Sequence, residues 1–241
     1  MTKHLPLFLF IGFAWGQIFT TLIESSSSQF STYKINPNSL DMEIILPSSG
    51  FSDLNEDGSK FLLIDSDSIL IYDSGSTNHL HISGKNARFT NNQNLIVYSR
   101  YSQIFKYDLI DSSETLIVDY ASHLGYFMLS SDKDEILYTK IQYEWGGLDS
   151  LDFILQNIET GDSISTTRVP DGHSFHWGED DYLYYAHEGL FKVNLHNNQE
   201  PPIQLINLTV DSSEVGIVSM SGSFSDKIIT WLWFGDGADR I

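Results

Sequence analysis

The sequence contains no cysteine and few basic residues. The absence of cysteine excludes a disulfide scaffold, a thiolate metal site, a cysteine nucleophile and a lipid anchor on an N-terminal cysteine. Only 13 Lys and Arg residues stand against 32 Asp and Glu residues, which gives a formal net charge of −19. An excess of negative charge of this size argues against nucleic acids and anionic membrane surfaces as partners.

Patterns typical of catalytic sites are also absent from the 241 residues. There is no G-x-S-x-G nucleophile elbow, no H-E-x-x-H zinc motif and no glycine-rich loop of the phosphate-binding type. After residue 30, no stretch keeps a helical hydrophobic period over several turns. The apolar content of 41% and the aromatic content of 13% nevertheless exclude a fully disordered chain and suffice for a core.

The N-terminal segment has the three parts of a secretory signal peptide. A basic start at Lys3 precedes an apolar run over residues 5–14, and small residues lead to a cleavage position after Gly16. We therefore expect a signal peptide over residues 1–16, a polar spacer over residues 17–30, and an exported protein, periplasmic or extracellular, with no membrane insertion after cleavage. The alternative is an uncleaved anchor, because apolar residues continue beyond the cleavage position.

A short pattern recurs along the rest of the chain: an aromatic residue, Lys, an apolar residue and then Asn or Asp. Its clearest copies are Tyr33–Asn36, Phe105–Asp108 and Phe191–Asn194. With two looser copies, the closing Asn or Asp falls at positions 36, 73, 108, 157 and 194. A polar turn with Asp or Asn precedes an apolar strand ahead of the later copies. Each unit therefore predicts four short strands, and such a unit repeated about every 40 residues is typical of β-propeller blades.

One of these polar turns, Asn55-Glu56-Asp57-Gly58, resembles the Ser-Pro-Asp-Gly turn of the TolB-type, WD40-like β-propeller repeat. The other copies keep only the Asp or Asn. The resemblance covers residues 31–241 and implies an all-β fold, a β-propeller of about five four-stranded blades. If the resemblance extends to function, it implies an envelope protein as the partner.

The two ends of the repeated region predict incomplete blades. Residues 33–46 supply a third and a fourth strand with no first or second, and residues 216–234 supply a first and a second strand. These halves could complete one blade and close a ring of five. The alternative is an incomplete ring, in which the chain is a fragment of a larger propeller or precedes another domain.

Two connections that follow a second strand combine aromatic residues, glycines and carboxylates. They span residues 142–150 and 231–239. Aromatic rings offer apolar area at low entropic cost, and carboxylates accept directional hydrogen bonds, which suits a peptide or a sugar. The alternative is that the tryptophans pack between blades. The candidate ligand-binding residues are Tyr143, Trp145, Asp149, Trp233 and Asp236.

A candidate metal site lies where Asp53, Asn55 and Asp57 match the first half of a calcium loop. The twelfth position of such a loop requires a bidentate acid and here holds Ile64. The segment also coincides with the polar turn of the repeat. A structural role is therefore the main alternative to calcium, and no other cofactor is expected.

Three functions are consistent with these patterns. The first is a non-enzymatic, exported propeller that binds a protein, peptide or glycan through the connections on one face. The second is the propeller part of a secreted, prolyl-oligopeptidase-like hydrolase whose catalytic domain lies outside this chain. The third is a structural surface module, in which the tryptophans contribute to stability alone.

Overall fold

The structure is a computed structural model, and its described part consists almost entirely of β-strands. The described residues are 12–14, 17–24, 29–36, 38–47, 49–73, 79–122, 126–141, 150–170, 175–178, 180–187, 189–207, 215–224 and 227–234. They form 22 strands. Within these ranges no helix has the length and hydropathy needed to cross a membrane.

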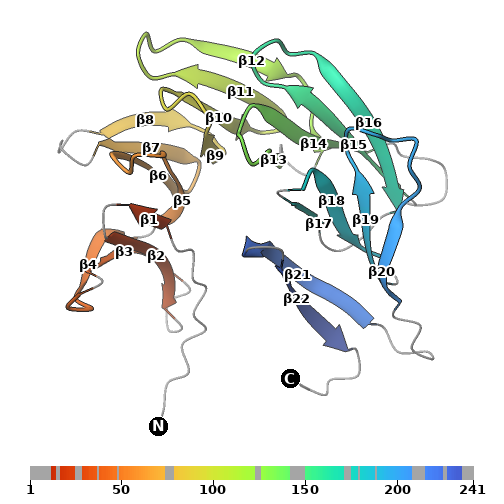
Figure 1. Ribbon diagram of the computed structural model, residues 1–241. Coiled ribbons are helices and arrows are strands. Elements are labelled where there is room, and N and C mark those ends of the chain that lie inside the picture. The colour runs from red at the N-terminus through yellow and green to blue at the C-terminus, as the bar shows by residue number, and fades with distance from the viewer. Residues whose placement is uncertain are drawn as a thin grey trace. The chain divides into compact units, whose positions relative to one another are not determined.

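The chain divides into two compact units, and the first comprises Met1–Tyr120. It contains three four-stranded antiparallel sheets, each with its strands in chain order (Figure 1). The first sheet consists of β1 (Gly12–Ala14), β2 (Gln17–Glu24), β3 (Gln29–Ile35) and β4 (Met42–Pro47). The second sheet consists of β5 (Gly50–Leu54), β6 (Lys60–Asp65), β7 (Ser68–Asp73) and β8 (His79–Ser83). The third sheet consists of β9 (Lys85–Phe89), β10 (Leu95–Arg100), β11 (Gln103–Asp108) and β12 (Glu114–Val118).

The second unit, Ala121–Ile241, contains two further four-stranded sheets and one two-stranded sheet. The fourth sheet consists of β13 (Phe127–Leu129), β14 (Glu135–Ile141), β15 (Ser150–Asn157) and β16 (Ser163–Pro170). The fifth sheet consists of β17 (Phe175–Trp177), β18 (Tyr182–Ala186), β19 (Gly189–Asn194) and β20 (Ile203–Asn207). The two-stranded sheet, which we call the C-terminal hairpin, consists of β21 (Val215–Phe224) and β22 (Lys227–Phe234). The expected all-β fold with about five four-stranded units is confirmed.

The register of the strands confirms the repeat that the sequence predicts. In four sheets, the first residue of the second strand lies opposite the Asp or Asn that ends the third strand. These cross-strand pairs are Lys60–Asp73, Leu95–Asp108, Glu135–Asn157 and Tyr182–Asn194. The recurring Asp or Asn therefore marks one structural position, the end of the third strand where the chain turns toward the fourth.

The polar turn of the repeat connects the first strand of a sheet to the second. In the second sheet, the amide of Asn55 donates to the carbonyl of Lys60 at 3.0 Å, and the amide of Lys60 donates to Asn55 Oδ1 at 2.8 Å. The amide of Gly58 closes the turn on the carbonyl of Asn55 at 3.0 Å, with φ at 70°. Glycine suits this left-handed position because it has no Cβ to clash. The same backbone bond recurs in the fourth sheet, from the amide of Ser130 to the carbonyl of Glu135.

The second sheet is covered on both faces within the first unit. Leu62 belongs to a buried cluster that includes Phe89 and Ile96 of the third sheet. Its neighbours Phe61 and Leu63 belong to a different cluster, which contacts the first sheet. Successive residues of a strand point to opposite faces, so a strand buried on both faces must be apolar at consecutive positions. This requirement explains the Phe-Leu-Leu-Ile run of β6.

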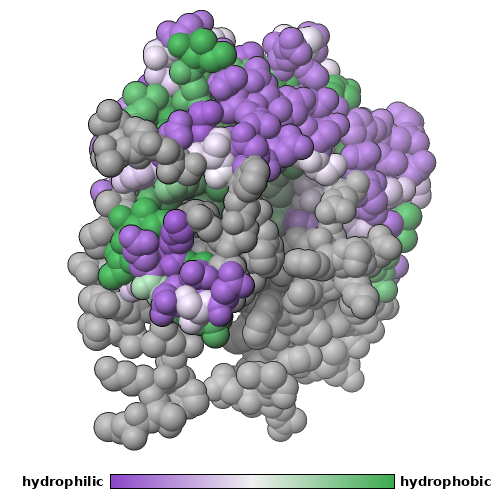
Figure 2. Space-filling model, turned by 60° about the vertical axis from the view of Figure 1, so that its left-hand side comes forward, coloured by the Kyte–Doolittle hydropathy of each residue, from purple (hydrophilic) through white to green (hydrophobic). Residues whose placement is uncertain are grey.

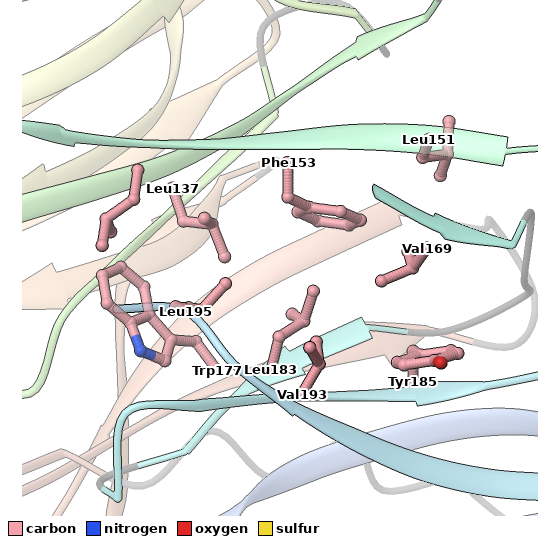
Figure 3. Close-up of a cluster of buried hydrophobic side chains, with 10 residues drawn as sticks. Leu137, Leu151, Phe153, Val169, Trp177, Leu183, Tyr185, Val193 and Leu195 are labelled. Carbon is pink, nitrogen blue, oxygen red and sulfur yellow. The ribbon is translucent and has the colours of Figure 1, made fainter. Parts of the chain in front are cut away.

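The fourth and fifth sheets share one hydrophobic cluster in the second unit (Figure 3). Leu137 and Phe153 of the fourth sheet lie in the same cluster as Trp177 and Leu183 of the fifth sheet. Leu137 and Leu183 are fully buried, with no exposed surface. Each small sheet thus buries a face against its neighbour, which a single isolated sheet of this size does not achieve.

The N-terminal sheet differs from the sequence-based expectation. Residues 33–46 were expected to lack a first and a second strand, and this is wrong: β3 pairs with β2 from Ile18–Ile35 to Glu24–Gln29. The apolar residues of β2 fit a strand as well as they fit the end of a signal peptide, so the sequence pattern alone did not separate the two. Because β3 and β4 pair in a sheet with β1 and β2, they do not complete the C-terminal hairpin. Signal cleavage after Gly16 stays a prediction.

Candidate functional site

The hairpins between second and third strands differ in length. The connection is two residues long between β6 and β7, between β10 and β11, and between β18 and β19. Between β14 and β15 it spans residues 142–149. The sequence-predicted insertion therefore lies in the fourth sheet, at a position where three other sheets have tight turns. Its candidate residues Tyr143, Trp145 and Asp149 lie outside the described residues.

The other two candidates are at the C-terminal end of the chain. Trp233 lies in β22, opposite Gly216 of β21, and is therefore part of a strand, not of a loop. Asp236 lies outside the described residues. Trp233 thus lies within a strand, whereas residues 142–149 connect two strands.

The strands that carry the 142–149 connection pair without interruption. Their register runs from Glu135–Asn157 to Ile141–Leu151, with no bulge. Next to the connection, Asp152 is 8% exposed and receives two hydrogen bonds from Arg168, from Nε to Oδ1 at 2.7 Å and from Nη2 to Oδ2 at 3.0 Å. The hydrogen bonds from Arg168 hold the pKa of the Asp152 carboxyl below its usual range. An insertion anchored on a regular strand pair is a suitable place for a binding site.

The equivalent turn of the third sheet presents an aromatic side chain that the sequence analysis did not single out. Tyr101 begins this two-residue turn with φ at 56° and is 84% exposed. At the same end of the sheet, Tyr120 is 52% exposed, and Gln103 Nε2 donates to Asp119 Oδ1 at 3.0 Å. A tight hairpin turn usually has Asn or Gly where φ is positive. A tyrosine in the two-residue turn between two predicted strands was therefore the feature of the sequence that could have indicated an exposed aromatic side chain.

Below Tyr101, a polar network fixes the end of β10. Arg100 Nη2 donates to Glu114 Oε2 at 2.7 Å and to the hydroxyl of Tyr98 at 2.9 Å, and its Nε donates to the carbonyl of Ser83 at 3.0 Å. The Tyr98 hydroxyl also donates to Glu114. Hydrogen bonding to Arg100 lowers the pKa of Glu114, and burial raises the pKa of Tyr98. Arg100, the residue before Tyr101, is therefore held by hydrogen bonds to three other residues.

The three candidate calcium ligands each have a hydrogen bond in the second sheet or to its neighbour. Asp53 Oδ2 accepts from the amide of Phe89 at 2.8 Å, Asn55 Oδ1 accepts from the amide of Lys60, and Asp57 Oδ1 accepts from the amide of Ser59 at 2.8 Å. These contacts belong to the turn and to the link between β5 and β9. In the part of the chain that the structure describes, no group of three His, Cys, Asp or Glu side chains could hold a metal ion.

The comparisons with known proteins give the fold. No family model and no curated protein matches the sequence. Among solved structures, TolB from Acinetobacter baumannii is similar with a TM-score of 0.53 and 17% identity, over 80% of this chain and 53% of that chain. The β-propeller domain of the trilobed protease from Pyrococcus furiosus, described as having an open velcro topology, is similar with a TM-score of 0.56 and 10% identity, over 98% of this chain and 83% of that chain.

A structure from a study of two prolyl endopeptidases is similar with a TM-score of 0.61 and 15% identity, over 88% of this chain and 37% of that chain. The chain thus spans about half the length of TolB and less than half of the prolyl endopeptidase chain. Together with the repeated four-stranded sheets, these similarities show a β-propeller fold of the kind found in TolB. A fold of this kind hosts many unrelated functions, so the function must be argued from the site.

Proposed function

We propose that this β-propeller is an exported binding module that recognises a protein, peptide or glycan through the connections between second and third strands. The observation that carries the proposal is the 142–149 connection, which is eight residues long where three other sheets have two. It contributes Tyr143, Trp145 and Asp149. Rings of this kind stack on sugars or peptide side chains, and the carboxylate accepts hydrogen bonds that orient the ligand.

The exposed Tyr101 supports this proposal from the first unit. It occupies the equivalent turn of the third sheet, and hydrogen bonds to Ser83 and Glu114 hold the preceding residue, Arg100. Aromatic side chains with few rotatable bonds lose little entropy on binding. Connections of the same type therefore contain aromatic residues in both units. Trp233 and Asp236 remain proposed ligand residues of the last sheet.

The proposed location and partner come from the sequence. The signal-peptide pattern of residues 1–16 supports export to the periplasm or the extracellular space. The similarity to TolB supports a protein of the cell envelope as the partner. The excess of acidic residues disfavours nucleic acids and anionic membrane surfaces.

A second candidate function is the propeller part of a secreted hydrolase. The observation that favours it is the similarity to a prolyl endopeptidase, of which this chain covers 37%. In that case the catalytic domain belongs to another part of the polypeptide, and the propeller controls access to it. The natural reading frame separates the two proposals: a G-x-S-x-G motif beyond Ile241 supports the hydrolase, and a stop codon there contradicts it.

The binding proposal is tested with a glycan and peptide array on the purified protein. We expect hits that disappear in Trp145→Ala and weaken in Tyr143→Ala, while the melting temperature stays unchanged, because the proposal assigns these rings to the ligand and not to the core. Tyr126→Ala is the matched control, since Tyr126 is 51% exposed and lies outside the second-to-third-strand connections. Hits that survive both Trp145→Ala and Trp233→Ala would contradict the proposal.

A further inference from the structure

Tyr101 occupies a position that is unfavourable for stability. It begins the turn between β10 and β11 with φ at 56°, in the left-handed region that bulky residues rarely adopt. Ser66 has the same φ, 56°, at the equivalent position between β6 and β7, so the turn does not require an aromatic residue. Because Tyr101 is 84% exposed, packing offsets little of this strain. A strained and exposed tyrosine favours a role other than stability.

A second exposed tyrosine lies at the same end of the third sheet. Tyr120 follows β12 and is 52% exposed. Gln103, the first residue of β11, donates from Nε2 to Oδ1 of Asp119 at 3.0 Å. Tyr101 is two residues from Gln103, and Tyr120 adjoins Asp119, so the Cα of each tyrosine lies within about 8 Å of one member of this pair. We call these four residues the tyrosine patch.

The tyrosine patch combines apolar faces with hydrogen-bonding groups. Among the described residues, neither tyrosine ring stacks on another ring. The bond between Gln103 and Asp119 uses one carboxylate oxygen and one amide N–H. Asp119 keeps a second acceptor oxygen, and Gln103 keeps a second N–H and its amide oxygen. Donors and acceptors therefore lie side by side next to the two rings.

The charges at this end of the sheet disfavour an anionic ligand. Arg100, which precedes the turn, forms an ion pair with Glu114, and Lys85 forms one with an aspartate of the turn between β6 and β7. Asp119 adds a negative charge to a chain whose net charge is −19. A carboxylate or phosphate would therefore meet repulsion and no uncommitted cation from Arg100 or Lys85.

A neutral sugar matches both kinds of group in the tyrosine patch. Each sugar hydroxyl donates and accepts hydrogen bonds, so neighbouring hydroxyls can use the Asp119 oxygen and the Gln103 N–H together. The C–H face of a sugar ring can stack on a tyrosine ring, which loses little entropy because it has few rotatable bonds. A cationic ligand would use the carboxylate and the rings but not the amide N–H.

We propose that the tyrosine patch binds a neutral carbohydrate, with a sugar ring on Tyr101 and neighbouring hydroxyls on Asp119 and Gln103. The inference rests on the proposed function, because it assigns a ligand class and a location to that binding module. It adds Tyr120, Gln103 and Asp119 to the proposed ligand residues. The left-handed turn keeps the ring of Tyr101 in solvent, which a binding role requires and a core role does not.

Isothermal titration calorimetry of the full chain tests the ligand class. The neutral probes are cellohexaose, maltohexaose and mannohexaose, and hexagalacturonate is the acidic probe of the same length. We expect saturable binding of one or more neutral hexasaccharides and no binding of hexagalacturonate. The affinity for the neutral sugar should stay constant between about 50 and about 300 mM sodium chloride, because the complex contains no ion pair.

Tyr101→Asn separates binding from stability. Asparagine tolerates a positive φ, so we expect the melting temperature to rise by about 2–4 °C while the affinity falls about tenfold or more. Tyr120→Ser weakens binding without this rise. Ile110→Asn is the matched control and keeps the affinity, because Ile110 is 75% exposed in the turn at the opposite end of the sheet. Ser66→Tyr, the reverse exchange at the same φ, lowers the melting temperature and adds no affinity.

Three results would overturn the inference: no saturable binding of any neutral hexasaccharide, an unchanged affinity in Tyr101→Asn, or a lower melting temperature in that variant. Array hits that depend on Trp145 would then still support the proposed function. Peptide hits that depend on Tyr101, without binding of a neutral hexasaccharide, would also contradict the inference, because the tyrosine patch then recognises a protein. Hexasaccharide binding that depends on Tyr101 and not on Trp145 supports the inference and contradicts the 142–149 connection as the binding site.

Discussion

Gly84 joins the second sheet to the third at a point where its backbone closely approaches the ring of Tyr98. A Cβ at this position would lie 2.5 Å from Cδ2 of Tyr98 and 2.7 Å from the carbonyl oxygen of Ser99. Tyr98 is fully buried, and Ser99 belongs to the central strand β10, so neither can move without disturbing the sheet. The requirement for glycine here comes from the close approach of β10, the strand that pairs with β9 directly after Gly84.

We predict that Gly84→Ala lowers the free energy of unfolding by about 1–3 kcal/mol, the usual cost of forcing extra volume into a packed site. Urea denaturation measures the effect. Gly50→Ala is the control, because a Cβ at Gly50 meets nothing within 4 Å. Equal losses for the two variants would show that chain flexibility, and not the contact with Tyr98, determines the effect.

His176 of β17 is a half-buried histidine whose Nε2 is buried and has no hydrogen-bond partner among the described residues. Burial lowers its pKa, and the negative charge of Asp180 opposes this shift. Tyr184 faces it across the strand pair, and Lys192 lies opposite Tyr184. The neighbouring strand β21 contains no titratable residue, and β22 contains only Lys227.

We predict that this histidine makes the fold less stable in mild acid. The folded state has a pKa below the unfolded value of about 6.5, so the unfolded chain binds more protons as the pH falls below about 6.5, and the free energy of unfolding decreases. His176→Gln is expected to flatten the dependence between pH 7.5 and 5.5 in urea denaturation. An unchanged slope in His176→Gln would contradict the prediction.

At the scale of the strands, position within a sheet determines exposure. Central strands such as β6 and β18 are buried on both faces, whereas the outer strands carry exposed apolar residues such as Leu116 and Ile164. Four of the five third-to-fourth strand pairs contain a register shift. Bulges of this kind disturb an edge and limit pairing with other chains.

We predict that truncation is costly in a central strand and mild in an outer strand. Leu183→Ala in β18 removes a fully buried side chain from the cluster of Figure 3 and is expected to cost about 2–5 kcal/mol. Ile164→Ala in β16, at a residue that is 43% exposed, is expected to cost less than about 1 kcal/mol. Comparable losses in urea denaturation would contradict burial of Leu183 between the two sheets.

At the scale of the whole molecule, the net charge of −19 means that carboxylates repel one another throughout the fold. On the face that Figure 2 shows, much of the described surface is hydrophilic, with smaller apolar areas. Ion pairs of the described residues, such as Arg168–Asp152 and Arg100–Glu114, neutralise a few carboxylates. The chain has only 13 Lys and Arg residues for 32 Asp and Glu residues, so most carboxylates have no cation to neutralise them. Self-repulsion of this kind destabilises a compact state.

We predict that salt stabilises the protein. Raising sodium chloride from about 10 to about 300 mM shortens the Debye length from about 30 Å to less than about 10 Å, which screens repulsion between distant carboxylates. The melting temperature should rise by a few degrees in scanning calorimetry, and an equal concentration of a zwitterion such as betaine should have a smaller effect. A fall in melting temperature with salt would show that attractive ion pairs outweigh the repulsion.

The repeated pattern was sufficient to predict the sheets but not the role of every residue. The Asp and Asn positions 73, 108, 157 and 194 locate the ends of third strands, since turns and alternating strands are encoded by neighbouring residues. Strands β1 and β2 were missed because an apolar segment near the N-terminus fits two structures. Tyr101 was missed because exposure depends on what the rest of the fold leaves uncovered.

The repeat in the amino-acid sequence was enough to predict the second to fifth four-stranded sheets and their order along the chain, because hairpins are short-range structures. The contacts between sheets required the folded structure. The bond from the Phe89 amide to Asp53 joins residues 36 apart, and Leu62 and Leu63 enter different clusters although they are adjacent. Such contacts depend on how twisted sheets stack face to face, which no local pattern of residues specifies.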